Sequence, residues 1–395
     1  MLKTEYEQLW IGNGKLVLEN QIQEDGSVLV ENGKIVALNI PCPPNADVID
    51  AMGGYILPGF IDLHVHGGGG SDFMDATVED MCAVTRAHAK HGTTALLATT
   101  MTCEDETLEK VIDTYLQAEN SAVGGAKLLG LHLEGPYFSS ANKGAQPVGE
   151  ERIPKREILE RFIMRAKGKI VRWDAAPELS NTDIFAEVMN ENGIIASVAH
   201  TAATAPQANA AFDSGFSHVT HLFSATSTGQ KIDGIVYSGV NEAALIRDDV
   251  TVEVICDGKH IPKEHMLLAY KMKGSDKMML ITDAMRAAAT NDKTSILGGK
   301  DTGVPVVIKD GVAQLPDLSF YAGSIGTMDR ALYVAHKEYG IPLVDAVKMM
   351  SLTPAEFLKI DNTKGSIEKG KDADIVVMNK DLKVEQVIVE GLLVC

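Results

Sequence analysis

Cysteine is scarce in this sequence, and its scarcity limits the kind of protein encoded. Five cysteines occur in 395 residues, an odd number, and no two of them form a CxxC pair. A disulfide framework is therefore not expected, and a reduced, cytoplasmic protein is predicted. Long apolar runs are missing as well. None approaches the ~20 residues of a membrane span, and the N-terminal residues have no signal-peptide core, so no membrane partner is expected.

Positive charge is also in short supply. Lys plus Arg number 36 against 54 for Asp plus Glu, which gives a formal net charge of −18. An acidic surface of this kind argues against nucleic acid or an anionic membrane as a partner. A small phosphorylated substrate remains compatible with the composition, because it responds to the local field of its pocket and not to the net charge.

The residues that are present suit a globular α/β protein. Hydrophobic residues make up 45% of the chain and charged residues 23%. Eight apolar, strand-like runs alternate with helical patterns, which favours a parallel sheet, and eight repeats favour a closed TIM-type (β/α)8 barrel of ~250 residues. The predicted strands are 56–65, 93–99, 127–133, 170–176, 193–199, 217–222, 251–256 and 278–282. The predicted helices are 77–91, 104–119, 155–166, 181–191, 262–273, 328–339 and 343–352.

Both ends of the chain are rich in short strands. Residues 27–36 read as a hairpin with an Asn-Gly turn, and 373–378 and 384–389 are strand-like near the other end. We therefore expect the two ends to pair into a small β-sandwich domain. Its predicted bounds are 1–55 and 360–395, with the catalytic barrel over 56–359.

Histidine and carboxylate side chains stand where the predicted barrel strands end. These residues are His64, His66, Glu134, His200, His221, Asp257 and Asp283. Active sites of such barrels lie at the C-terminal ends of the strands, and converging imidazoles and carboxylates are what a divalent metal needs. Residues two apart on a strand face the same side, so His64 and His66 can reach one ion. Five other histidines lie in helices or mid-pattern, where ordinary packing explains them: His88, His91, His218, His265 and His336.

Several motifs resemble those of known enzymes. Residues 58–67 (PGFIDLHVHG) resemble the opening motif of the amidohydrolase superfamily, and 365–376 resemble its closing β segment. Within that superfamily, further motifs resemble those of the N-acetylglucosamine-6-phosphate deacetylase family, in the same order along the chain. They are 132–136, 199–201, 220–223, 257–260 and 282–284. The resemblance implies an enzyme of amino-sugar metabolism that hydrolyses N-acetylglucosamine 6-phosphate to glucosamine 6-phosphate and acetate, and it implies a homodimer.

The resemblance also implies roles for individual residues. One or two divalent ions, zinc or iron, would be bound by His64, His66 and Glu134 on one side and by Glu134, His200 and His221 on the other. Asp283 would act as the general base and then as the general acid, with helix capping as the alternative role for this residue. His260 and the metal would polarise the acetyl carbonyl.

The substrate contacts match the family less well. Gln146 stands where the family has a histidine, and Lys231 is only the nearest counterpart of its phosphate-binding arginine, with a solvated surface lysine as an equal alternative. The substrate contacts that the resemblance implies are Gly135, Gln146, Ser224, Ala225, Lys231, His260 and Met328. Two alternatives stay open: a paralogue acting on another N-acylated amine or amino sugar, and a catalytically inactive metal- or sugar-binding protein.

Overall fold

The larger part of the molecule is a barrel of parallel strands. The computed structural model describes residues 7–121, 124–147 and 151–395. The barrel strands are β6 (Phe60–Val65), β9 (Thr93–Thr99), β10 (Lys127–Tyr137), β11 (Ile170–Ala175), β12 (Ile195–Val198), β13 (His218–Val219), β16 (Thr251–Ile255) and β17 (Met278–Ile281). They pair in the order β17-β16-β13-β12-β11-β10-β9-β6. The edges nearly meet, because the N–H of Asp283 donates to the carbonyl of His64 at 3.0 Å. The predicted (β/α)8 barrel is confirmed.

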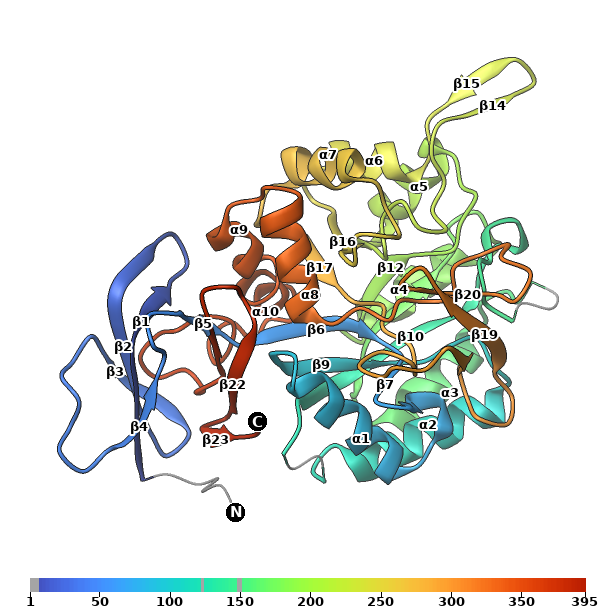
Figure 1. Ribbon diagram of the computed structural model, residues 1–395. Coiled ribbons are helices and arrows are strands. Elements are labelled where there is room, and N and C mark those ends of the chain that lie inside the picture. Colours follow the sequence, from blue (N-terminus) through green and yellow to red (C-terminus); the bar gives the residue numbers. More distant parts are fainter. Residues whose placement is uncertain (1–6, 122–123, 148–150) are drawn as a thin grey trace.

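Helices surround this barrel (Figure 1). They are α1 (Val78–Ala89), α2 (Asp105–Ala118), α3 (Arg156–Ala166), α4 (Thr182–Glu191), α5 (Ala205–Ser214), α6 (Val240–Ile246), α7 (Lys263–Lys273) and α8 (Met328–Tyr333), with 3-10 turns at Phe73–Asp75 and Ser140–Asn142. In α2 the buried residues include Leu108, Val111, Ile112 and Tyr115, the spacing of one helical face. The sequence-based prediction missed the short helices α5 and α6. It also joined α9 (Leu343–Lys348) to the start of α10 (Leu352–Phe357) and did not foresee the π-helix Val334–Glu338 that follows α8.

Both chain ends pair into one small β domain, as predicted, but their described strands form a single sheet and not two packed sheets. Its strands are β1 (Gln8–Val17), β2 (Ile22–Glu31), β3 (Lys34–Leu38), β4 (Asp47–Asp50), β5 (Tyr55–Pro58), β21 (Ile375–Met378), β22 (Val384–Val389) and β23 (Leu392–Leu393). The antiparallel pair β5–β21 joins the two ends. The single strand expected at 56–65 is wrong, because the chain divides at Gly59 into β5 of this sheet and β6 of the barrel. Glycine is required at this division, because a Cβ on Gly59 would clash with the Thr94 hydroxyl oxygen at 2.1 Å.

The two ends of the barrel interior differ in polarity. One end is filled by apolar side chains, among them Ile61, Leu63, Leu97 and Ile281, and α10 contributes Ala355 to this cluster. The opposite end carries the histidines and carboxylates. The apolar end stabilises the barrel because its side chains are removed from water. The histidines and carboxylates lie at the C-terminal ends of the strands, where active sites of such barrels are found. Within the described residues, no helix is both long and apolar enough to cross a membrane.

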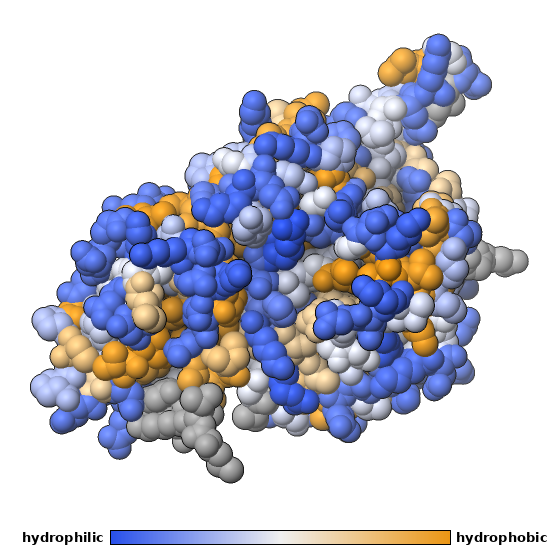
Figure 2. Space-filling view, in the orientation of Figure 1, coloured by the Kyte–Doolittle hydropathy of each residue, from blue (hydrophilic) through white to orange (hydrophobic). Residues whose placement is uncertain are grey.

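Within the described residues, three β insertions follow barrel strands. The hairpin of β14 (Gln230–Ile232) and β15 (Ile235–Tyr237) projects away from the body of the molecule (Figure 1). Figure 2 shows apolar surface among hydrophilic surface at this hairpin, where Ile235 is 59% and Val236 76% exposed. A three-stranded sheet of β18 (Thr294–Leu297), β19 (Val304–Lys309) and β20 (Val312–Gln314) follows β17. A short β7 (Gly67–Gly68) and β8 (Ser71–Asp72) ribbon follows β6.

Candidate metal centre and catalytic site

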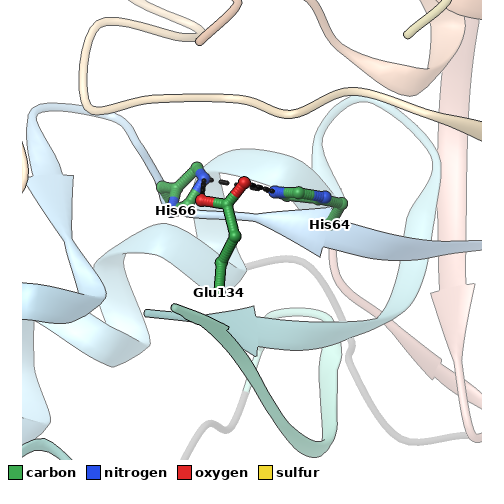
Figure 3. Close-up of side chains that lie close together, drawn as sticks. All are labelled: His64, His66 and Glu134. Atoms are coloured by element: carbon green, nitrogen blue, oxygen red, sulfur yellow. Dashed lines mark hydrogen bonds and ion pairs between the residues drawn. The ribbon is translucent and has the colours of Figure 1, made fainter. Parts of the chain in front are cut away.

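Three of the predicted ligands converge at the end of β6 and the neighbouring part of β10. The Nε2 atoms of His64 and His66 lie 3.2 Å apart. The carboxylate of Glu134 faces both rings, with Oε2 3.4 Å from His66 Nε2 and Oε1 3.6 Å from His64 Nε2 (Figure 3). All three side chains are buried. We call these residues the first half-site.

The other two predicted ligands approach Oε1 of the same carboxylate. The Nε2 atoms of His200 and His221 lie 3.1 and 3.0 Å from Glu134 Oε1. These histidines come two residues after the ends of β12 and β13, and both have left-handed backbones, with φ of +43° and +30°. Non-glycine residues rarely adopt such angles, and they cluster at functional sites. Glu134, His200 and His221 form the second half-site.

The ring protonation expected at these sites fits bound cations. His200 Nδ1 is 3.2 Å from the carbonyl of Asn142, and His64 Nδ1 is 2.8 Å from the Glu253 carboxylate. An acceptor at Nδ1 places the proton there, which leaves a lone pair on each Nε2 that points toward Glu134. The two half-sites therefore offer imidazole nitrogens and a shared carboxylate, the donor set that zinc and iron take.

The electrostatics of Glu134 also favour positive charge at this point. Burial disfavours its ionised form, but the neighbouring histidines outweigh burial and hold the pKa of Glu134 well below its usual range. Burial likewise lowers the pKa of His221, but the hydrogen bond and charge of Glu134 reverse this and raise it to about 9. The negative charge of Glu134 therefore stabilises positive charge on the groups beside it. A divalent ion bound between these residues would be stabilised in the same way.

Asp283 follows β17 and faces the first half-site. Its Oδ1 lies 3.2 Å from His66 Nε2 and 3.5 Å from His64 Nε2, and its φ is +49°. Burial favours its neutral form, but the charge of His64 and the hydrogen bond to His66 keep the pKa of Asp283 below its usual value. In the described chain the next helix begins only at Met328, so Asp283 caps no helix. An ionised carboxylate in this place can accept a proton.

His260 is oriented by a carboxylate of its own. Its Nδ1 lies 2.7 Å from Oδ2 of Asp257, which follows β16. The His260 ring also contacts the Tyr321 ring edge-on, with 5.0 Å between centroids. The pair with Asp257 fixes the ring so that its Nε2 is left for a ligand in the cavity.

The half-sites open into a cavity. Its lining includes the site residues His66, Glu134, His200, His221, His260 and Asp283, together with Gln146, Ser224 and Ala225. Its volume is about 70 Å³. An outer pocket of about 740 Å³ adjoins it and shares Gly144, Ser224, Ala225 and Tyr321 in its lining. An amino sugar fits the outer volume, and its reactive group would reach into the inner cavity.

The predicted substrate contacts fall into two groups. His260, Gln146, Ser224 and Ala225 line the inner cavity. The Gln146 side chain is held by its neighbours, because Nε2 donates to Glu134 Oε2 at 2.5 Å and Oε1 accepts from the N–H of Thr102 at 3.0 Å. The other three residues lie outside both pocket linings: Gly135, Lys231 and Met328.

Each of these three outliers has a clear place in the structure. The carbonyl of Gly135 accepts a hydrogen bond from the Trp173 indole at 2.8 Å. Met328 begins α8 and is fully buried in the apolar core. Lys231 lies in β14 of the projecting hairpin, where it is exposed. A substrate role for these residues stays a prediction.

The sequence-based reasoning missed a carboxylate and a guanidinium directly behind the first half-site. Glu253 of β16 and Arg172 of β11 are completely buried, and Arg172 Nη1 lies 2.5 Å from Glu253 Oε2. Burial disfavours ionisation of Glu253, but the charge of Arg172 and the hydrogen bonds from His218 and His64 hold its pKa well below the usual range. Their position in the sequence could have revealed them, because Arg172 and Glu253 are charged residues inside the predicted apolar strands 170–176 and 251–256.

With this geometry described, comparison with known proteins gives the family. The family model described as "Amidohydrolase family" matches residues 55–394. The chain belongs to the amidohydrolase family. The N-acetylglucosamine-6-phosphate deacetylase of Bacillus subtilis is 34% identical over 391 residues, covering 98% of this chain and 96% of that protein. The predicted resemblance to this enzyme family is thereby confirmed.

Two further relatives bear on the substrate. The N-acetylgalactosamine-6-phosphate deacetylase of Escherichia coli is 30% identical to this amidohydrolase over 380 residues, covering 96% of this chain and 97% of that protein. A mutant N-acetyl-D-glucosamine-6-phosphate deacetylase from Mycobacterium smegmatis was solved in complex with N-acetyl-D-glucosamine-6-phosphate. It aligns with a TM-score of 0.89 at 28% identity, covering 99% of both chains.

Proposed function

We propose that this amidohydrolase hydrolyses the N-acetyl amide of N-acetylglucosamine 6-phosphate and yields glucosamine 6-phosphate and acetate. The observation that carries the proposal is the convergence of both half-sites and Asp283 on one cavity, in a chain that matches such deacetylases over nearly its whole length. A catalytically inactive binding protein would have no need for Asp283 beside a full ligand set.

The cofactor that we propose is a pair of divalent ions, zinc or iron, with Glu134 shared between the half-sites. A divalent ion bound there would lower the pKa of its water toward ~7 and polarise the acetyl carbonyl. The protein's own contribution is to hold five ligand groups close together and buried, so that little reorganisation is needed when an ion binds.

Asp283 and His260 would handle the protons and the developing charge. Asp283 is ionised and stands beside the first half-site, so it can accept a proton from the attacking water. The same carboxyl can then deliver that proton to the amine, which leaves poorly unless protonated. The Asp257 carboxylate lies 2.7 Å from His260 Nδ1 and orients the ring, so that Nε2 would face the acetyl oxygen on which negative charge develops.

We propose that phosphate recognition involves a second copy of the chain. Lys231 stands on a hairpin that projects from its own barrel, so in a homodimer it could reach the outer pocket of the other subunit. The exposed Ile235 and Val236 beside it are suited to contact with a partner. Lys309 lines the outer pocket within the chain itself and is the competing phosphate anchor.

An acetate-release assay on the metal-loaded protein tests the reaction. The substrates are N-acetylglucosamine and N-acetylgalactosamine, each with and without the 6-phosphate. We expect the highest kcat/KM with N-acetylglucosamine 6-phosphate. A preference for the galactosamine epimer would assign the second activity found among the relatives, and no acetate from any of the four sugars would reject the proposal.

A further inference from the structure

A group of charged and polar side chains fills the barrel interior directly beneath the first half-site. We call this group the interior ionic cluster. It consists of His132, Arg172, Asp174, His218 and Glu253, from β10, β11, β13 and β16. Each of the five side chains is completely buried. Burying charges at the centre of a barrel is expensive, and replacing them by apolar residues often costs no stability. A role beyond packing is therefore worth seeking.

Glu253 links this cluster to the metal ligands. Its Oε1 lies 2.8 Å from His64 Nδ1 and 2.9 Å from Arg172 Nη2, while its Oε2 lies 2.5 Å from Arg172 Nη1. The guanidinium therefore grips both carboxylate oxygens and fixes the plane of the carboxylate. One of those oxygens is left to accept the Nδ1 proton of His64.

This contact determines what His64 offers on its other side. With the proton held at Nδ1, Nε2 carries a lone pair, and it points to the place where His66 Nε2 and Glu134 also meet. A carboxylate behind a histidine ligand fixes the tautomer and the ring orientation and makes the ligand more basic. The second half-site has no such carboxylate: His200 rests on a backbone carbonyl, and among the described residues His221 Nδ1 has no hydrogen-bond partner.

We propose that Glu253, clamped by Arg172, is the positioning residue that builds the ion site at His64 and His66, and that it thereby lets this enzyme hold two ions. The inference rests on the proposed binding of divalent ions by the two half-sites. It gives the costly interior ionic cluster a function, because within that cluster Glu253 is the residue whose carboxylate oxygen lies at hydrogen-bond distance from His64 Nδ1.

Metal content of purified, metal-loaded variants tests this role. Glu253→Gln keeps the shape of the side chain but replaces one carboxylate oxygen with an amide NH2, which cannot accept a hydrogen bond from Arg172 or His64, and it removes the negative charge behind His64. We expect zinc affinity at the first half-site to fall about 10- to 100-fold. In mass-spectrometric metal analysis after dialysis against a weak chelator, the content should fall from two ions per chain to one. Unchanged content and affinity would overturn the proposal.

Asp174→Asn is the matched control. Asp174 belongs to the same cluster, 2.9 Å from His132 Nε2 and 3.5 Å from Arg172 Nε, and no contact joins it to the five ligands. We expect this variant to keep two ions. Equal loss of the first ion in Asp174→Asn would show that the cluster acts only through general structure, and it would overturn the specific role of Glu253.

Glu253→Gln leaves Arg172 with an incomplete partner, and a buried unpaired charge can prevent folding. The double variant Glu253→Gln/Arg172→Met removes both charges and is expected to fold with one ion per chain. A measurement on the unmodified protein is independent of folding defects: nitrogen NMR of metal-free protein labelled in its histidine rings should find His64 as the Nδ1–H tautomer. The Nε2–H tautomer would overturn the proposal.

The outcomes also separate this inference from the proposed function. Wild-type protein that binds no divalent ion would reject the metal-dependent reaction itself. Two ions in both the wild type and Glu253→Gln, with acetate still released, would reject only the role of Glu253.

Discussion

The two halves of the metal centre are built in different ways. The first half-site takes His64 from β6 and His66 from just after that strand, and Glu253 and Arg172 support it from inside the barrel. The second half-site takes His200 and His221 from residues that follow two strands, both with positive φ. Both of these histidines line the substrate cavity, whereas only His66 of the first pair does so.

The two half-sites thus differ in what holds their ligands in place and in how open they are to the substrate. The first half-site is held by side-chain charges in a region closed to solvent, where low dielectric makes such contacts strong. The second half-site is held by backbone conformation at loop starts, and its rings face the space that the substrate enters. We therefore expect the second ion to act on the substrate and the first to be the better insulated of the two.

Removing one ligand from each half-site gives the largest expected effects. His221→Ala should lose the second ion and more than ~10⁴-fold in kcat/KM, since polarisation of the carbonyl and activation of the water are lost with the ion. His66→Ala should lose the first ion and a smaller part of the activity. Metal analysis and acetate release on both variants check this order, and a greater loss in His66→Ala would reverse the assignment of the two ions.

Asp283 lies beside the first half-site, and we expect it to transfer protons during the reaction and not to bind metal. Asp283→Asn keeps the size of the side chain and cannot accept a proton at neutral pH, so kcat should fall about 10²–10⁴-fold. Metal content should stay near normal, because the five ligands remain. Steady-state kinetics with metal analysis checks this. A kcat close to the wild-type value would make Asp283 only a ligand.

Acid should loosen the ribbon that follows the first half-site. His88 Nε2 lies 2.9 Å from the carbonyl of Gly67, and its buried Nδ1 has no partner in the described chain. Burial lowers the pKa of His88 to about 4, so the unfolded chain binds the proton more readily between that value and ~6.5. Stability from this residue is therefore complete above ~6.5 and is lost as the pH falls toward 4.

The size of this effect is up to about 3 kcal/mol. His88→Gln keeps a donor for Gly67 and does not titrate, so its unfolding free energy should fall less between pH 7 and 4.5 than that of the wild type. Denaturant unfolding at the two pH values measures the difference. The partly buried His336 supplies the control His336→Gln, and an equal change in both variants would remove His88 from this role.

The smallest expected effect concerns the outer pocket, away from both half-sites. Lys231→Ala should raise KM for the 6-phosphate sugar roughly tenfold, the worth of one charge-assisted hydrogen bond, and leave the unphosphorylated sugar unchanged. Lys309→Ala is the comparison, because Lys309 lines the outer pocket of its own chain. The same KM change with both sugars, or an effect of Lys309→Ala alone, would remove Lys231 as the anchor.

Local sequence patterns were enough to predict the barrel strands, most of the helices and the ligand types at the strand ends. These features are local: strand and helix periodicities show within a short window, and a polar residue at the end of an apolar strand is visible without knowledge of its neighbours. The predicted ligand histidines, Glu134 and Asp283 were selected in this way and through family motifs, and the structure brings them close together.

The contacts that those residues make depend on the folded chain as a whole. His64 and Glu253 are 189 residues apart in the chain and 2.8 Å apart in space, and no local pattern pairs them. Gln146 turned out to hold Glu134, and Lys231 turned out to lie on a projecting hairpin. Closing the barrel brings distant strands into register, so the contacts behind a ligand depend on the whole sheet and not on the sequence around either partner.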